Sequence, residues 1–497
     1  MDGSLLPADA PLRTRPPALA RRVLLIAALA LAATFALPAA GASAATVPAG
    51  MLGMNDWTSP SDQTLANISR AGVRRWRAAL FWAYVEPTRG NRDWSQYDAL
   101  VASAARRNVS LLLVMASCPY WACSELAGPP TSAAGLDGER AFLRAAVSRY
   151  GTNGSFWRAH PELPRRPVTD WQVWNEVNAR EFWTPSPNAA DYARFLRDNA
   201  AVIRSADPRA TVVMSGLTEF GQIAVAPFLA QLYAQPGFRA SFDVVAVHAY
   251  EPNTARVVAL LDRTRRVMSA HGDARKPLWI TEMGWGTTSA ALRTPYTEAD
   301  QAALLRESFD TLIGCRSRWN LSRAYWFAYK DNRPAPGETD YAGNHTGLFD
   351  LSGRPKQAWS TLQGFREGAN RPQAGCAQAT RSSSRPPQTR IKLRRRTRRT
   401  RRARAKLVAS VSGARFECRL ARTRRARKGR RAAHKPGRWR RCRNRYRSPR
   451  LRRGVRYKLL VRARDRFGRV DRSPARAKLR LRRSRRGKLV LVARVRR

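Results

Sequence analysis

The chain has 497 residues, of which 44% are hydrophobic and 15 are tryptophans. That length fits about two to four domains, or one barrel of about 250 residues with an additional domain. It excludes a disulfide-stapled mini-protein, and the apolar fraction excludes a wholly disordered chain. Charge divides the chain: residues 381–497 contain 50 Lys and Arg but three acids, so they carry +47 of the total of +56. Residues 1–380 therefore have the balance of an ordinary globular protein, and the rest does not.

The first 44 residues predict an export signal. Four arginines precede an apolar run from Val23 to Leu37, and Ala42-Ser43-Ala44 is a small-x-small cleavage pattern, so we expect cleavage after Ala44. An uncleaved membrane anchor is the alternative, but the run is shorter than the roughly 20 residues that cross a bilayer. We therefore expect a protein that is secreted, extracellular or associated with the cell envelope.

The cysteine count agrees with export. There are six cysteines, an even number, and we expect structural disulfides. A redox or metal pair is the alternative for the first two, but their spacing and the lack of a nearby histidine argue against zinc. No cofactor, metal site or glycine-rich phosphate loop is predicted. The expected pairs are Cys118–Cys123, Cys315–Cys376 and Cys418–Cys442.

Short apolar runs alternate with longer amphipathic runs between residues 50 and 365. Eight runs are rich in β-formers and apolar on both faces, which is typical of buried parallel strands. This alternation predicts an α/β fold, a (β/α)8 TIM barrel over residues 45–368. A doubly wound open sheet is the alternative; the number of strands and the polar residues at their ends favour the barrel. The predicted strands are 51–54, 73–78, 110–116, 168–174, 211–215, 243–248, 278–282 and 323–327, and the predicted helices include 97–107, 190–205, 254–270 and 297–313.

Polar and aromatic residues follow several of these strands. In (β/α)8 barrels the chemistry lies at the C-terminal ends of the strands. Two carboxylates with aromatic walls suit glycosidic-bond cleavage, because one carboxyl must donate a proton to the leaving oxygen while the other is ionised. The candidate residues are Arg77 on the second strand, Asn175 and Glu176 after the fourth, His248 and Tyr250 at the sixth, Glu282 on the seventh and Trp326 on the eighth.

These segments resemble the glycoside hydrolase clan A barrels. Trp171-Gln-Val-Trp-Asn-Glu-Val-Asn178 looks like the acid/base motif, and Trp279-Ile-Thr-Glu-Met-Gly-Trp285 looks like the nucleophile strand. The segment from Gly347 to Trp359 is similar to the part that closes the barrel. The resemblance covers residues 50–365 and is nearest to families 39 and 5, although Ala116-Ser117-Cys118 stands where family 5 members carry a histidine.

The resemblance implies a retaining mechanism through a covalent glycosyl-enzyme. Glu176 would be the acid/base and Glu282 the nucleophile, with carboxyl groups about 5–5.5 Å apart. The implied function is a secreted glycoside hydrolase that acts on a polysaccharide or oligosaccharide. The implied substrate-binding residues are Asn175 at the 2-hydroxyl, Tyr250 holding Glu282, His248 and Arg77 supporting the site and Trp326 as the sugar platform, and Trp285 is a further candidate for a sugar subsite.

Two other functions fit parts of the sequence. One is a catalytically silent carbohydrate-binding or cell-envelope adhesion protein on a barrel scaffold. The presence of both Glu176 and Glu282 argues against it. The other is a secreted nucleic-acid-binding protein with a passenger barrel, although no helix-turn-helix, zinc-finger or RNP pattern is present.

The basic C-terminal region is expected to contain a second folded domain. Residues 369–404 predict a basic disordered linker, because a run of like charges repels itself. From residue 405 apolar and charged residues alternate as in half-buried strands. Segments such as Trp439-Arg-Arg-Cys442 resemble a bacterial immunoglobulin-like or fibronectin-III-like repeat, which predicts a small basic β-sandwich over 405–485. Residues 486–497 predict a basic tail.

A polycation of this size predicts an anionic partner. Candidates for residues 381–497 are a polyanionic cell-envelope polymer or an anionic surface. The alternative is a solvated surface that merely reflects an arginine-rich genome.

Overall fold

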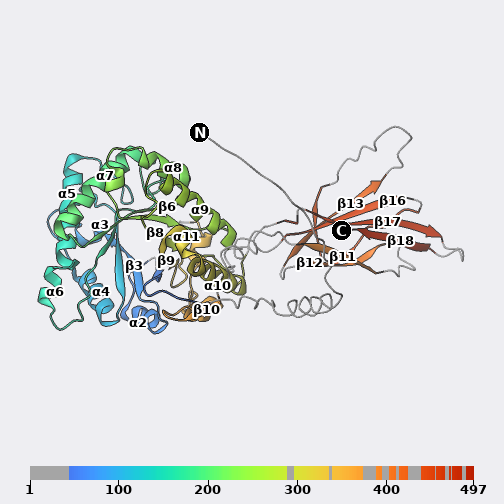
Figure 1. The fold of residues 1–497 in the computed structure, drawn as a ribbon, viewed down its shortest axis with the longest axis horizontal. Helices are drawn as coiled ribbons and strands as arrows, with labels where there is room; N and C mark the ends of the chain where they lie inside the picture. The colour runs from blue at the N-terminus through green and yellow to red at the C-terminus, as the bar shows by residue number, and fades with distance from the viewer. Residues whose placement is uncertain are drawn as a thin grey trace, which may run out of the picture. The chain divides into compact units, whose positions relative to one another are not determined.

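A computed structural model of the chain describes residues 44–56, 58–287, 296–334, 339–372, 388–394, 402–409, 414–423, 438–453, 455–464, 470–471, 473–483 and 489–496. Eight parallel strands form a closed barrel in the order β2-β3-β4-β5-β6-β7-β8-β9, and helices surround it (Figure 1). The predicted (β/α)8 barrel is therefore confirmed, and the open doubly wound sheet is excluded.

All eight predicted strands are present, with ends that shift by a few residues. The strands are β2 Leu52–Asn55, β3 Arg75–Phe81, β4 Ser110–Ala116, β5 Asp170–Gln172, β6 Thr211–Thr218, β7 Val244–His248, β8 Leu278–Met283 and β9 Leu321–Phe327. The helices around them are α2 Asp62–Arg70, α3 Trp82–Val85, α4 Ser95–Arg106, α5 Ala133–Tyr150, α6 Ser155–Ala159, α7 Ala189–Ala206, α8 Val225–Tyr233, α9 Thr254–Ala270, α10 Glu298–Gly314, α11 Arg316–Trp319 and α12 Gln357–Gln363, with short 3-10 turns at Phe238–Ala240 and Ala342–His345.

The barrel has two layers of apolar packing. Side chains alternate across a strand, so each strand sends one set inward and one set toward the helices. The larger core lies between the strands and the helices. A smaller cluster fills the barrel interior and comes from strands β4, β6, β7, β8 and β9; its members are Leu112, Val213, Val244, Ala246, Trp279 and Tyr325.

The two ends of the barrel region are joined by a short ribbon. Strand β1 (Ala44–Thr46) pairs antiparallel with β10 (Asn370–Pro372). The segment that precedes the first barrel strand is thus fastened to the segment that follows the last helix. No described helix has both the length and the apolar character to cross a membrane.

The C-terminal region contains two antiparallel sheets that share one apolar core. Alternating residues of both sheets, such as Leu407 and Leu459, are buried in it. The structure thus confirms the predicted small all-β domain, while its resemblance to an immunoglobulin-like or fibronectin-III-like repeat stays a prediction. The three-stranded sheet is β11 (Thr389–Arg394), β12 (Arg404–Ala409) and β15 (Arg445–Arg447), and the five-stranded sheet is β14 (Arg440–Cys442), β13 (Arg415–Thr423), β16 (Arg456–Arg464), β17 (Ala475–Arg483) and β18 (Leu489–Arg496).

Two of these strands lie where the sequence analysis expected no regular structure. Strand β11 falls inside the predicted linker 369–404, and β18 falls inside the predicted tail 486–497. In β11 the buried Thr389 and Ile391 alternate with exposed basic residues. The density of charge concealed this alternation, and a charged strand is stable when its other face is apolar.

The disulfide predictions are confirmed where they can be followed. Cys118–Cys123 and Cys418–Cys442 are both formed. Cys376 lies outside the described residues, so its pairing with Cys315 stays a prediction. The predicted export signal also lies outside them, apart from Ala44.

A buried carboxyl group lies in the helical layer. Glu139 of α5 is 0% exposed, and its polar neighbour is Asn199 of α7. Burial raises the pKa of Glu139 to about 8, against the opposing effects of the Asn199 hydrogen bond and the charge of Arg140; the charge of Asp198 adds to the rise. The folded protein therefore keeps Glu139 protonated at neutral pH.

We predict that Glu139→Gln reduces the loss of stability that occurs as pH rises from about 4.5 to about 8. The folded-state pKa of Glu139 exceeds its unfolded value of about 4.5. The contribution of Glu139 to the free energy of unfolding is therefore complete below pH 4.5. It declines as pH rises toward 8, by at most about 1.4 kcal/mol per pH unit. Urea unfolding at pH 5, 6.5 and 8 should show that the free energy of unfolding of the variant increases relative to that of the wild type as pH rises. Glu181→Gln, at an exposed position, is the control; parallel profiles for Glu139→Gln and the wild type would refute the assignment.

Candidate active site

Arg77 of β3 lies beneath the predicted site and joins three strands. Its side chain is 6% exposed. The guanidinium donates to Gln172 Oε1 at 2.7 Å, to Asn175 Oδ1 at 2.8 Å and to Glu282 Oε1 at 2.6 Å. The flat fork of the guanidinium suits several fixed acceptors at once. One buried cation thus orients residues from β5, the loop after β5, and β8.

Glu282 points into the site because β8 is irregular. The pairing of β7 with β8 runs Val247↔Ile280 and then His248↔Glu282, so β8 has one additional residue at this point. Such bulges redirect side chains and recur beside active sites. The Glu282 side chain is 12% exposed and accepts a second hydrogen bond, on Oε2, from the Tyr250 hydroxyl at 2.6 Å.

The surroundings of Glu282 favour its charged form. Burial by itself raises the pKa of this carboxyl, but the charges of His248 and Arg77 and the hydrogen bonds from Tyr250 and Arg77 outweigh burial and lower the pKa below its usual value. Burial and the negative charge of Glu282 raise the pKa of the Tyr250 hydroxyl well above its ordinary value. Tyr250 therefore stays protonated and donates to an ionised Glu282.

Glu176 follows β5 on a backbone that ordinary residues avoid. Its φ is 41°, and the φ of Trp174 is 69°. Left-handed conformations of non-glycine residues are uncommon and cost of order 1–3 kcal/mol, and they cluster at functional sites. The turn brings Glu176 Oε1 to 2.6 Å from His248 Nδ1. The Glu176 side chain is 16% exposed, so it remains accessible.

His248 stands between the two glutamates. Its side chain is 0% exposed, and Nε2 lies 3.5 Å from Glu282 Oε1, which is long for a hydrogen bond. A Cβ on Gly216 of β6 would lie 2.1 Å from Nε2. Only glycine at position 216 leaves room for the imidazole there. Gly216 and Gln172 belong to the site although the sequence analysis did not single them out.

The predicted site residues therefore converge, with their two carboxyl groups close together. One carboxylate oxygen of Glu176, one of Glu282 and a nitrogen of His248 all lie within 4.8 Å of one another. Three such donors could hold a cation. However, Glu282 already accepts hydrogen bonds on both oxygens, and one donor is the positive guanidinium of Arg77. A metal would have to displace that contact, so the donor set fits the acid/base pair better.

The structure corrects the two predicted tryptophan roles. Trp326 is 0% exposed and packs toward the helical layer against Phe309, so no ring face is open to a sugar. Trp285 is 3% exposed, and its indole N–H donates to the Glu251 carbonyl. Strand alternation places the next residue, Phe327, on the other face of β9. The Phe327 ring stands edge-on to Tyr250, with the ring centroids 6.2 Å apart.

Exposed aromatic side chains occur in four of the segments that follow barrel strands. Aromatic rings left in water at the face that carries the glutamates are typical of binding surfaces. They are Tyr84 after β3, Tyr120 after β4, Phe220 after β6 and Tyr341 after β9, which are 63%, 76%, 76% and 52% exposed.

The comparisons with known proteins agree with this geometry. Residues 167–357 match the family model of the glycosyl hydrolase catalytic core. The match contains both Glu176 and Glu282. No curated protein sequence matches the chain significantly.

Solved structures share the fold at low sequence identity. A monomeric beta-xylosidase from Caulobacter crescentus CB15 superimposes with a TM-score of 0.50 at 18% identity, covering 76% of this chain and 84% of that chain. The GH39 enzyme from Xanthomonas axonopodis pv. citri gives a TM-score of 0.50 at 16% identity, covering 77% and 82%. Residues 167–357 are thus similar to the glycosyl hydrolase catalytic core, and the barrel shares its fold with these solved enzymes.

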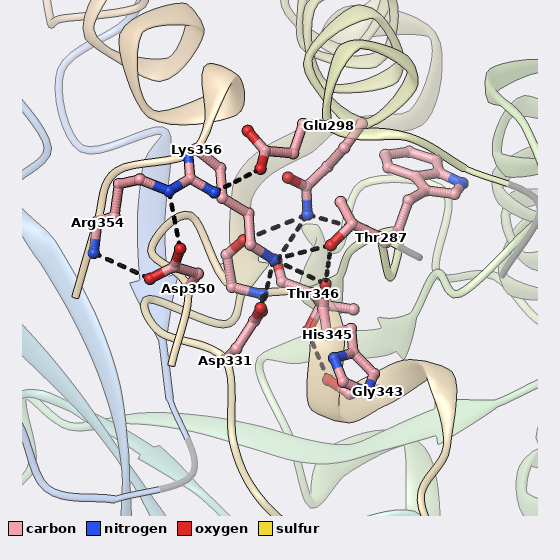
Figure 2. Close-up of polar contacts among 12 residues, drawn as sticks. Thr287, Glu298, Asp331, Gly343, His345, Thr346, Asp350, Arg354 and Lys356 are labelled. Carbon is pink, nitrogen blue, oxygen red and sulfur yellow. Dashed lines mark hydrogen bonds and ion pairs between the residues drawn. The ribbon is translucent and has the colours of Figure 1, made fainter. Parts of the chain in front are cut away.

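A buried lysine connects the loops that follow the last two barrel strands (Figure 2). Lys356 is 3% exposed, and its ammonium donates to Asp331 Oδ1 at 2.6 Å, Thr287 Oγ1 at 3.0 Å and the His345 carbonyl at 3.1 Å. Burial lowers the pKa of Lys356 and raises that of Asp331, while their mutual attraction opposes both shifts. The pair fixes the loop after β8, close to Glu282, against the loop after β9.

We predict that Lys356→Met destabilises the protein by about 3–5 kcal/mol, because it leaves the Asp331 carboxylate buried without its cation. The double variant Lys356→Met/Asp331→Asn should recover most of this loss, since the amide is neutral and its oxygen can still accept from the Gly347 N–H. Denaturant unfolding measures both. Lys330→Met, at an exposed position, should change stability by less than about 0.5 kcal/mol, and a similar loss in that variant would show that the buried pair is not the cause.

Proposed function

We propose that this protein is a secreted retaining glycoside hydrolase that cleaves O-glycosidic bonds of a polysaccharide or oligosaccharide. The observation that carries the proposal is the pair of carboxyl groups, with an oxygen of each within 4.8 Å, in different environments. Retaining enzymes hold these groups about 5–5.5 Å apart, whereas inverting enzymes need about 6.5–9.5 Å to admit a water molecule. The separation here supports double displacement.

In the first step Glu282 attacks the anomeric carbon. Its carboxylate forms the new bond while the bond to the leaving oxygen breaks, and Glu176 gives its proton to that oxygen. Arg77 and Tyr250 keep Glu282 ionised before the attack and hold it in position. Since Arg77 engages Asn175 Oδ1, the Asn175 amide N–H groups remain to donate to a sugar hydroxyl.

In the second step water releases the sugar. Glu176 is then ionised and takes a proton from the water that attacks the anomeric carbon, and the bond to Glu282 breaks. His248 supports both protonation states of Glu176, because a ring nitrogen can accept from a carboxylic acid or donate to a carboxylate. Its 2.6 Å contact with Glu176 supports this positioning role.

The exposed aromatic residues support a saccharide substrate. The segments that follow four different barrel strands carry them at the face of the glutamates: Tyr84, Tyr120, Phe220 and Tyr341. Aromatic faces pack against the apolar faces of sugar rings, and Tyr adds a polar group. Phe327 would take the place beside the reacting sugar that the sequence analysis gave to Trp326.

We also propose that the protein is exported and that its basic region holds it on an anionic polymer. The export pattern of residues 1–44 and the disulfides Cys118–Cys123 and Cys418–Cys442 support export. The charge of residues 381–497 supports an anionic partner such as a cell-envelope polymer.

Trapping with activated 2-deoxy-2-fluoro glycosides tests the nucleophile. The fluorine slows hydrolysis of the glycosyl-enzyme, so the sugar should remain on Glu282, where peptide mass spectrometry locates it. Glu282→Gln should give no adduct, and Glu176→Gln should still react when the leaving group needs no proton. An adduct on Glu176 or on another residue would overturn the assignment. If no glycoside in the panel reacts, retention of polysaccharides would decide whether the barrel only binds sugars.

We predict that Tyr250→Phe moves the acid limb of the kcat/KM profile to higher pH. The hydrogen bond from Tyr250 lowers the pKa of Glu282, so losing it raises that pKa, and activity that needs an ionised Glu282 then disappears at a higher pH as the solution is acidified. The rate should also fall about tenfold or more. A pH profile with an activated aryl glycoside measures both effects. An unmoved acid limb would show that Tyr250 does not control Glu282 ionisation.

A further inference from the structure

The three-stranded sheet has an outer surface formed by basic residues. In β11 and β12 the apolar side chains Ile391, Ala405 and Leu407 enter the core shared with the other sheet. The residues between them point the other way and are exposed. We call the following set the cationic face: Arg390, Lys392, Arg404, Lys406, Arg445 and Arg447.

The strand register places like charges directly opposite one another on the cationic face. Lys392 pairs with Lys406, which pairs on its other side with Arg445, so three cations form a row across the sheet. Arg404 is opposite Arg447 in a second row. Like charges in this position are destabilising. Strands β11, β12 and β15 contain no acid, and no residue of the cationic face forms an ion pair with the described part of the chain.

An arginine-rich composition does not account for this surface, because the barrel balances its arginines differently. There, several surface arginines pair with acids, as in Arg107–Asp62, Arg140–Asp137 and Arg318–Asp262. The same chain thus supplies acids to its barrel surface and supplies none to the cationic face.

The outer surface of the five-stranded sheet is also less purely cationic. Glu417 of β13 accepts from Arg462 at 2.6 Å and lies 3.7 Å from Arg464. The guanidinium of Arg462 lies over the Trp439 ring, 4.3 Å from its centroid. Internal contacts therefore occupy part of that surface, and the cationic face is the better docking surface for an anion.

We propose that the cationic face binds a linear acidic polysaccharide through its carboxylate groups. This inference rests on the proposed binding of the basic region to an anionic polymer. Neighbouring strands lie about 4.8 Å apart, and alternate residues of a strand about 6.7 Å apart, so the face is a regular lattice of cations. A chain with a repeating charge can contact several of them at once. Single-stranded nucleic acid is disfavoured because no exposed aromatic residue stands among the described residues of this face to stack on a base.

Such binding would deliver substrate to the barrel. A polysaccharide that is bound to the cationic face has a higher effective concentration at the barrel of the same protein. The cationic face would thereby direct a general glycosidase toward acidic polysaccharides, or toward neutral ones embedded with them.

The test compares two variants of the full chain with equal loss of charge, both in a Glu282→Gln background that prevents cleavage. One is Lys392→Gln/Lys406→Gln/Arg445→Gln on the cationic face. The matched control is Arg456→Gln/Arg476→Gln/Lys478→Gln, which removes three exposed cations from the five-stranded sheet. Equilibrium binding to polygalacturonate is measured at several salt concentrations, with dextran as the uncharged polymer and duplex DNA as a competitor.

The expected result is a Kd for polygalacturonate that rises about tenfold or more in the first variant and less than about twofold in the control, with a shallower salt dependence in the first. Equal losses of affinity in both variants would refute the cationic face as the binding site, but the proposal that the basic region binds an anionic polymer would stand. Preferential binding of duplex DNA over polygalacturonate would refute the proposal that the partner is an acidic polysaccharide. If the parent chain binds neither polygalacturonate nor DNA, the proposed anionic partner itself fails.

Discussion

The candidate active site depends on the position of one buried cation. Arg77 donates to a neutral amide oxygen on β5, to the side-chain oxygen of Asn175 and to the carboxylate of Glu282. A charge this deeply buried is tolerated only when its donors find acceptors and an opposite charge lies nearby. Glu282 supplies that charge, and Gln172 and Asn175 supply the other acceptors. The same contacts keep Glu282 ionised and hold the Asn175 side chain in one orientation, so stability and chemistry rest on the same hydrogen bonds.

Regular secondary structure would not bring the two glutamates together. The bulge in β8 turns Glu282 inward, and the left-handed backbone at Glu176 turns the end of β5 toward His248. Gly216 leaves space for the imidazole between them. The surrounding barrel and its helical layer provide the packing that compensates for these unfavourable local conformations, since strained residues persist where the rest of the structure fixes them. The polar network around Lys356 fixes the following loops in the same way.

Much of this arrangement could be predicted from the sequence because the barrel places every strand end at one face. The spacing and length of the apolar runs were enough to predict the eight strands. The polar residues at the strand ends were enough to predict which side chains converge: Arg77, Asn175, Glu176, His248, Tyr250 and Glu282. The direction of a side chain at a strand end was not predictable in the same way. Successive side chains of a strand point to opposite faces, so Trp326 points away from the barrel interior and its neighbour Phe327 points into it. The roles of Gly216 and Gln172 depend on distances across the barrel, which no local pattern records.

The two modules use arginine in opposite ways. In the barrel, many arginines pair with acids of the same structure: Arg77 pairs with Glu282 at the site, and the exposed Arg107 and Arg318 pair with neighbouring aspartates. In the three-stranded sheet, repulsion between the rows of cations must be offset by the apolar core on the other side, which buries Ile391 and Leu407. Charge density makes strand β11 hard to recognise in the sequence, because a run of like charges by itself favours an extended, unfolded segment. A sheet can carry such a face when its inner residues are apolar, and its uncompensated charge then remains available to an anion from outside the chain.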